Sequence, residues 1–136
     1  MWAHEGDAVE SFPDDVIRFL YDNVESIDQL EILRVLGENL EREWNALALA
    51  EEVQAKHHDV RAHLARMQAR GLLTIATREA GICCRYGVST PELDHMVTRL
   101  LQLYKERPVT MIKLVYERAK DPLRAFADAF RIRKEE

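Results

Sequence analysis

No stretch of the chain approaches the roughly 18 uninterrupted apolar residues of a membrane-spanning helix. The opening segment, MWAHEGDAVE, is acidic, whereas a secretory signal peptide begins with basic and then apolar residues. Glycine and proline are scarce, with five and four residues in a chain of 136, which leaves few places to turn. We therefore expect a cytoplasmic, mostly helical protein that forms a single domain over residues 1–136.

The chain has only two cysteines, Cys83 and Cys84, and they are adjacent. Neighbouring side chains of a strand point to opposite faces, so this pair is poorly placed to form a disulfide or to hold one metal ion. We expect Cys83 to face outward and Cys84 to lie in the core. No second cysteine cluster accompanies His57, His58 and His63, so we expect neither a metal site nor any other cofactor.

Patterns typical of catalysis are missing as well. The sequence has no nucleophile elbow, no phosphate-binding glycine loop and no zinc-protease spacing, since HEGD at residues 4–7 lacks the second histidine. The sequence therefore does not predict an enzyme.

The charges are unevenly distributed, although the formal net charge is only −5. Residues 1–55 hold 14 acidic and 3 basic side chains, residues 56–90 hold 2 and 6, and residues 91–136 hold 8 and 10. A protein with such a basic segment can present it to a polyanion while the remainder keeps the chain soluble. The overall acidity therefore does not exclude DNA as a partner.

Two amphipathic helices are predicted in the first 40 residues. Ser11 and Asp14 form a capping pattern with Pro13 in the first turn, which predicts a helix over residues 11–25. A second capping pattern, at Ser26, opens the next helix. The apolar side chains on one face are Val16, Phe19, Leu20 and Val24 in the first helix and Ile27, Leu30, Leu33, Leu36 and Leu40 in the second.

The middle of the chain predicts helix, turn, helix and hairpin. Gly71 is the type of residue expected just past a helix C-terminus. The elements are a short extended link at Trp44, a helix over residues 46–54, a turn over 55–57, a helix over 58–70, and strands over 72–77 and 82–88 joined by TREAG at 77–81.

Residues 26–88, in this order of elements, resemble the winged helix-turn-helix domain of bacterial transcriptional regulators of the MarR, PadR and ArsR kind. The resemblance rests on L-A-x-x-V at residues 49–53 and V-x-x-x-L-x-x-M-x-x-x-G-L-L at residues 60–73. It implies a mostly α-helical fold with a small β-hairpin wing, to which the predicted N-terminal helix and the predicted C-terminal helices over residues 89–134 are added. It also implies DNA binding through the 58–70 helix and the wing, although winged helices serve as protein-docking modules too.

The 58–70 helix turns Val60, Leu64 and Met67 to the core and presents an alanine-centred face outward. Arg, Lys, Asn and Gln read base edges, whereas alanine offers at most a contact with a thymine methyl group. We expect His58 and Arg61 to read bases and the other cations to bind phosphate, which gives modest or shape-based specificity. The predicted DNA-binding residues are Lys56, His58, Arg61, Ala62, Ala65, Arg66, Arg70 and Arg78.

The same face also suits a protein partner. Small outward side chains flanked by arginines allow close approach of a second protein, and arginine is favoured in interfaces. The predicted function is therefore a DNA-binding transcriptional regulator, and the alternative is a winged-helix adaptor that binds another protein but not DNA.

The last third of the chain predicts further helices. Thr90 and Pro91 open one helix, Pro108 interrupts it, and Asp121 with Pro122 starts a last one. An apolar stripe on the first of these suits a homodimer seam or packing on the core, and we expect a homodimer. The predicted dimerisation residues are Leu93, Val97, Leu100 and Tyr104.

Overall fold

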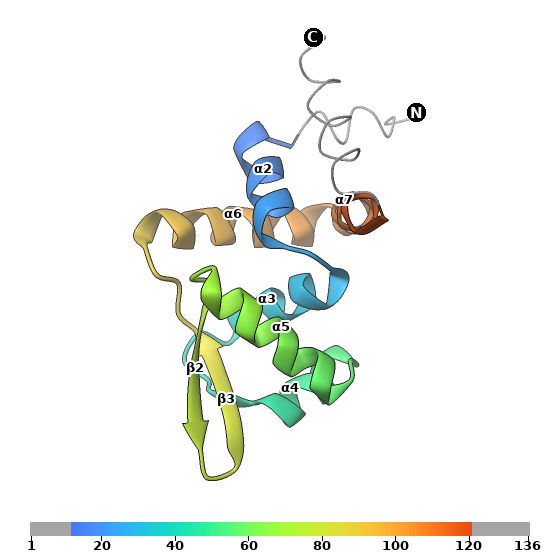
Figure 1. The fold of residues 1–136 in the computed structure, drawn as a ribbon. Helices are drawn as coiled ribbons and strands as arrows, with labels where there is room; N and C mark the ends of the chain where they lie inside the picture. Colours follow the sequence, from blue (N-terminus) through green and yellow to red (C-terminus); the bar gives the residue numbers. More distant parts are fainter. Residues whose placement is uncertain (1–11, 121–136) are drawn as a thin grey trace, which may run out of the picture. The chain divides into compact units, whose positions relative to one another are not determined.

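The fold comes from a computed structural model, which describes residues 12–120. The predicted cap at Ser11 and the predicted last helix from Asp121 lie outside these residues. The described chain is mostly helical with one small antiparallel sheet (Figure 1). Its contacts divide it into two compact units, one over residues 28–98 and one that joins the residues before position 28 to those from Arg99 onward.

The 28–98 unit covers most of the region that the sequence predicted as helix, turn, helix and hairpin. Its helices and strands follow the predicted order. They are nearly all of α3 (Ile27–Glu38), β1 (Trp44–Asn45), α4 (Ala46–Val53), α5 (His57–Ala69), β2 (Leu73–Arg78), β3 (Gly81–Tyr86) and the first half of α6 (Pro91–Glu106).

Apolar side chains at helical spacing form the core of this unit. The predicted inner face of α5 is confirmed, because Val60, Leu64 and Met67 are fully buried. Leu30 and Leu33 of α3 are buried with them. Removing such side chains from water provides most of the stabilisation available to a small unit.

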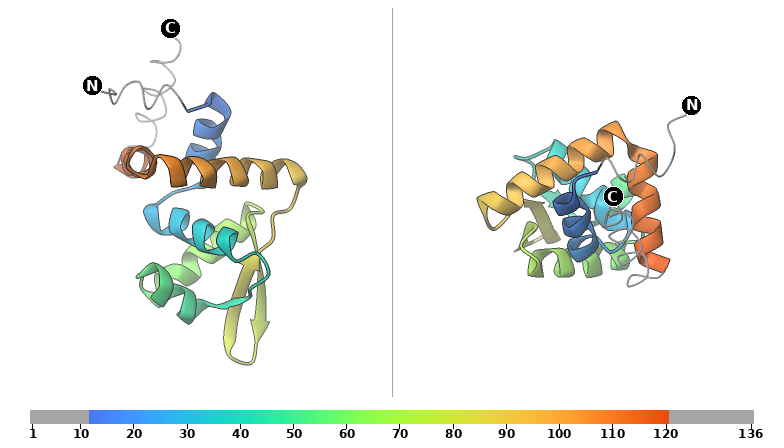
Figure 2. Two further views of the ribbon diagram at one scale, coloured as in Figure 1. Left: turned by 180° about the vertical axis from the view of Figure 1, so that it is seen from behind. Right: turned by 90° about the horizontal axis from the view of Figure 1, so that it is seen from above.

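The sheet has three strands in the order β1–β3–β2, all antiparallel. The β2–β3 register pairs Arg78 with Gly81, so the hairpin turn consists of Glu79 and Ala80 alone, which is shorter than the predicted 77–81 turn. Gly81 has a φ of 115°, a backbone conformation that side-chain-bearing residues rarely adopt. The hairpin turn projects beyond α4 and α5 of the same unit (Figures 1 and 2).

Gly71 ends α5 as predicted. Its φ is 78°, and the Leu72 amide donates to the carbonyl of Met67 over 3.0 Å. The Ser89 amide in turn donates to the Gly71 carbonyl over 2.9 Å, which fixes the end of the hairpin beside the end of the helix.

Three predicted boundaries were wrong. Helix α2 begins at Asp14, so Pro13 precedes the helix instead of lying in its first turn. Helix α3 ends at Glu38, and the Asn39 side chain donates a hydrogen bond from Nδ2 to the Val35 carbonyl over 2.8 Å. Leu40 therefore lies beyond the helix and is 52% exposed instead of buried. Helix α5 begins at His57, one residue earlier than predicted.

The other unit contains α2 (Asp14–Asn23), the end of α6 and α7 (Pro108–Lys120). Helices α6 and α7 meet at a sharp angle at Arg107, since Pro108 begins the second of them (Figure 2). Arg99 of α6 forms an ion pair of 2.7 Å with Asp15 of α2, and Arg118 of α7 donates to the Tyr21 carbonyl over 2.8 Å. None of the helices between residues 12 and 120 has the length and apolar character needed to cross a bilayer.

Candidate nucleic-acid interface

The predicted DNA-binding residues of α5 share its outer side. Lys56 is the N-cap residue of α5 and has extended backbone angles. Arg70 follows the last helical residue and is half-buried. The exposed members of the set are Lys56, His58, Arg61, Ala62, Ala65 and Arg66.

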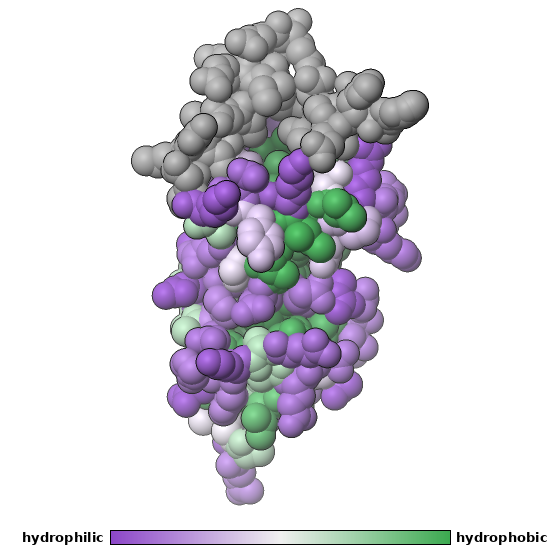
Figure 3. All heavy atoms as spheres, turned by 90° about the vertical axis from the view of Figure 1, so that its right-hand side faces the viewer, coloured by the Kyte–Doolittle hydropathy of each residue, from purple (hydrophilic) through white to green (hydrophobic). Residues whose placement is uncertain are grey.

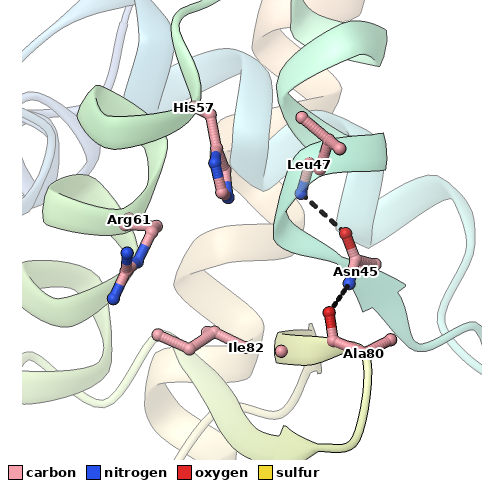
Figure 4. Close-up of a pocket in the computed structure, with 7 residues that line it drawn as sticks. Asn45, Leu47, His57, Arg61, Ala80 and Ile82 are labelled. Carbon is pink, nitrogen blue, oxygen red and sulfur yellow. Dashed lines mark hydrogen bonds between the residues drawn. The ribbon is translucent and has the colours of Figure 1, made fainter.

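A hollow of about 260 Å³ lies where α5, the start of α4 and the hairpin turn converge (Figure 4). His57 and Arg61, one helical turn apart, line it from α5, and Leu47 lines it from α4. The hairpin contributes Ala80 and Ile82. The hollow therefore adds the start of α4 to a surface that the sequence predicted from one helix and a wing.

Asn45 holds two walls of this hollow together. Its Oδ1 accepts a hydrogen bond from the Leu47 amide over 2.9 Å and caps α4, while its Nδ2 donates to the Ala80 carbonyl over 3.1 Å. The hairpin turn is thus tied to the first turn of α4 through one side chain.

His57 was missed as a site residue because the sequence predicted it in the preceding turn. With α5 starting at His57, His57 and Arg61 are separated by four positions and lie on the same side of the helix. No signal in the sequence distinguished a start at His57 from one at His58, because Asp59 lies in the first turn of the helix in either case.

The charges on α5 are mostly positive and partly unpaired. Within residues 12–120, no carboxylate pairs with Lys56 or Arg61. His58 lies 3.1 Å from the Asp59 carboxylate, a contact that becomes an ion pair when the imidazole is protonated. Two cations at the N-terminal half of α5 therefore remain available to a bound anion.

Arg78 is placed differently from the α5 cations. Its guanidinium donates from Nη2 to Oε1 of Glu43 over 2.7 Å and from Nε to Oε2 over 3.0 Å. The hydrogen bond with Arg78 is the main reason why the pKa of Glu43 is lowered, so this carboxylate stays ionised at neutral pH. No pattern in the sequence indicates this pair, whose members are 35 positions apart.

Both cysteine thiols are buried, so the prediction that Cys83 faces outward was wrong. Strand β3 is the middle strand of the sheet, with Asn45 beside Cys83 on one side and Ala76 on the other. The Cys83 thiol donates a hydrogen bond to the Gly81 carbonyl of the same strand over 3.9 Å. Cys84 lies in the core as predicted, with 1% of its surface exposed.

His63 packs between α5 and α3. Gln29 donates from Nε2 to His63 Nδ1 over 3.1 Å, and His63 Nε2 lies 3.7 Å from the Asp28 carboxylate. His63 thus contacts two polar residues of α3. Over residues 12–120 the structure contains no group of three histidine, cysteine or acidic side chains arranged to hold a metal ion.

The predicted dimerisation stripe is largely buried within the chain itself. Val97 and Leu100 have no exposed surface and Tyr104 is 9% exposed, while Leu93 is half-buried. Of the two uses that the stripe allowed, burial favours packing on the chain's own core. The homodimer stays a prediction, and these side chains do not define its interface.

Large apolar side chains reach the surface at few described positions. Figure 3 shows one face on which hydrophilic residues predominate and hydrophobic ones occupy limited areas. The exposed large apolar residues among positions 12–120 are Leu40, Leu47, Val109 and Tyr116. Leu47 and Ile82 line the hollow together with Arg61, so that surface combines a cation with apolar side chains.

Comparison of the chain with protein-family models, with curated proteins and with solved structures found no match.

Proposed function

We propose that the chain binds double-stranded DNA as a winged-helix transcriptional regulator. In this proposal α5 enters the major groove and the β2–β3 hairpin is the wing, which contacts the backbone or the minor groove. The order of α3, β1, α4, α5, β2 and β3, and the three-stranded sheet that β1 completes, support it.

The observation that carries the proposal is the position of Arg61. Its side chain is exposed, has no carboxylate partner among residues 12–120 and lines the hollow between α5 and the hairpin. An unpaired guanidinium between a helix and a projecting hairpin is well placed for a phosphate oxygen or for the O6 and N7 acceptors of guanine.

The remaining α5 residues define how selective such binding can be. Lys56, Arg66 and Arg70 flank the helix and suit phosphate, which adds affinity without reading sequence. Ala62 and Ala65, at the centre of the exposed face, read at most a thymine methyl group. We infer modest or shape-based sequence specificity. In a symmetric dimer, two such helices would meet half-sites about one helical turn apart.

A protein-docking role is the second candidate, and two features favour it. Leu47, which lines the hollow, is 52% exposed. The exposed face of α5 also carries small side chains at Ala62 and Ala65, which allow close approach of a second protein. Arginine is enriched in protein interfaces, and an exposed apolar side chain near it favours a protein partner.

Variants of Arg61 distinguish these candidates by fluorescence anisotropy with a labelled random-sequence duplex. Arg61→Ala is expected to weaken binding several-fold and to lower the slope of log Kd against log salt by about one. Arg61→Lys keeps the charge, so it preserves a phosphate contact but loses a bidentate contact to guanine. Lys105→Ala removes an equal charge from the exposed side of α6 and is the matched control. Equal effects of Arg61→Ala and Lys105→Ala would contradict the proposed site.

A further inference from the structure

The Arg78–Glu43 pair engages a cation that the hairpin would otherwise offer to DNA. Both hydrogen bonds, of 2.7 and 3.0 Å, run from one guanidinium to one carboxylate, so the two donors on that edge of Arg78 are taken. The side chain of Arg78 is 57% exposed and that of Glu43 is 35% exposed. The pair therefore lies at the surface, where another anion can reach it.

Glu43 is held in this position by its neighbours in the chain. It directly precedes β1, whose residues Trp44 and Asn45 pair with Cys84 and Cys83 of β3. The Asn45 side chain also holds the hairpin turn through the Ala80 carbonyl. Glu43 consequently faces the hairpin whether or not Arg78 is bound to a second anion.

We propose that Glu43 competes with DNA phosphate for Arg78 and thereby lowers the affinity of the α5–hairpin surface for DNA. The inference rests on the proposed function, and it assigns to Glu43 a role in setting the strength of that function. A guanidinium edge binds one oxyanion with two hydrogen bonds at a time, so a phosphate must displace the carboxylate to be held in the same way.

The size of the effect follows from the exposure of the pair. Solvent-exposed ion pairs are weak, so replacing Glu43 by the uncharged glutamine is expected to tighten DNA binding by roughly two- to fivefold. The freed Arg78 adds one phosphate contact, which steepens the slope of log Kd against log salt by about 0.9. Because Arg78 is engaged in the natural chain, Arg78→Ala alone changes affinity little, whereas in the Glu43→Gln background it removes the gain.

A double-mutant cycle tests this with the labelled random-sequence duplex. Kd is measured by anisotropy at several salt concentrations for the natural chain, Glu43→Gln, Arg78→Ala and the double variant, after circular dichroism has shown that each is folded. Glu41→Gln, an exposed acid two positions earlier, makes the same change in charge and is the matched control.

Tighter binding by Glu43→Gln than by Glu41→Gln, cancelled by Arg78→Ala, is the expected result. Binding by Glu43→Gln that equals or falls below that of Glu41→Gln overturns the inference and leaves the proposed function standing, since it shows that Glu43 does not compete or that it orients Arg78 for DNA. Failure of every variant to bind the duplex overturns the proposed function itself.

Discussion

The buried Gln29 of α3 donates a hydrogen bond from Nε2 to Nδ1 of His63 in α5, over 3.1 Å. Nδ1 therefore accepts, and the ring proton lies on Nε2, which faces the Asp28 carboxylate 3.7 Å away. Gln29 is the only buried polar side chain found among residues 12–120, and it joins two helices of the same unit. The contact links α3 to α5 beside the buried face that Val60, Leu64 and Met67 define.

Replacing Gln29 by leucine tests the strength of this contact. The variant keeps most of the side-chain volume but leaves Nδ1 of His63 without its donor, so the free energy of unfolding is expected to fall by about 1–3 kcal/mol. Urea unfolding followed by circular dichroism measures the change. Gln68→Leu, at an exposed position of α5, is the control and should stay within about 0.5 kcal/mol of the natural chain. Equal stability of the two variants would show that the contact contributes nothing.

The turn after α5 requires glycine for two separate reasons. A residue with a side chain at position 71 would have to adopt a φ of 78°, and its Cβ would clash with the Ser89 hydroxyl oxygen. Gly71→Ala is expected to cost more than about 1 kcal/mol of unfolding free energy. Adding Ser89→Ala removes that oxygen and should recover part of the loss, whereas Ser89→Ala alone has little effect at its exposed position. Strictly additive effects in urea unfolding would refute the steric part of this account.

Burial raises the pKa of the Cys84 thiol to about 12, with smaller contributions from Cys83 and Glu43. An unfolded thiol ionises near pH 8.5, so above that pH the unfolded state loses a proton that the folded state keeps. The stability provided by the neutral thiol is therefore full below about pH 8.5 and declines as the pH rises toward 12. Between pH 8 and 10, urea unfolding should show a steeper decline for the natural chain than for Cys84→Ala. Parallel declines would contradict the raised pKa.

Leu100 was predicted to contact a second copy of the chain, yet it has no exposed surface in one copy. Placing a charge there should unfold the chain instead of separating a dimer, so Leu100→Glu is expected to cost about 3 kcal/mol or more. His95→Glu, at an exposed position of the same helix, should stay within about 0.5 kcal/mol of the natural chain. A Leu100→Glu variant of natural stability but half the mass in sedimentation would place Leu100 at a subunit interface after all.

The parts of the fold that repeat regularly could be predicted from the sequence. The spacing of Val60, Leu64 and Met67 defined the inner face of α5, and Gly71 marked its end. Helix starts were less predictable. The residue before α5, Lys56, is not of a type that caps a helix with its side chain, and it makes no capping hydrogen bond, so its residue type did not mark the start of the helix at His57. A shift of one residue was enough to hide the place of His57 in the hollow.

Contacts between distant residues could not be predicted, because no periodic pattern encodes them. Gln29 and His63 are 34 positions apart, and Glu43 and Arg78 are 35 apart. Alternation along a strand predicted an exposed Cys83, but alternation alone does not say that β3 is the middle strand. The α5 side of the candidate site was therefore predicted, whereas its α4 wall and the engagement of Arg78 were found only in the structure.

The salt dependence of DNA binding tests the central proposal most directly. Anisotropy of the unmodified chain with labelled genomic fragments and random duplex would be measured at about 50 and 200 mM salt. If the four cations of α5 and its caps, Lys56, Arg61, Arg66 and Arg70, each contact a phosphate, Kd should rise on the order of 100-fold between these conditions. Such a rise, with tighter binding to some fragments than to random duplex, is the predicted result. Absence of binding at the lower salt would contradict the proposal and favour the protein-docking role.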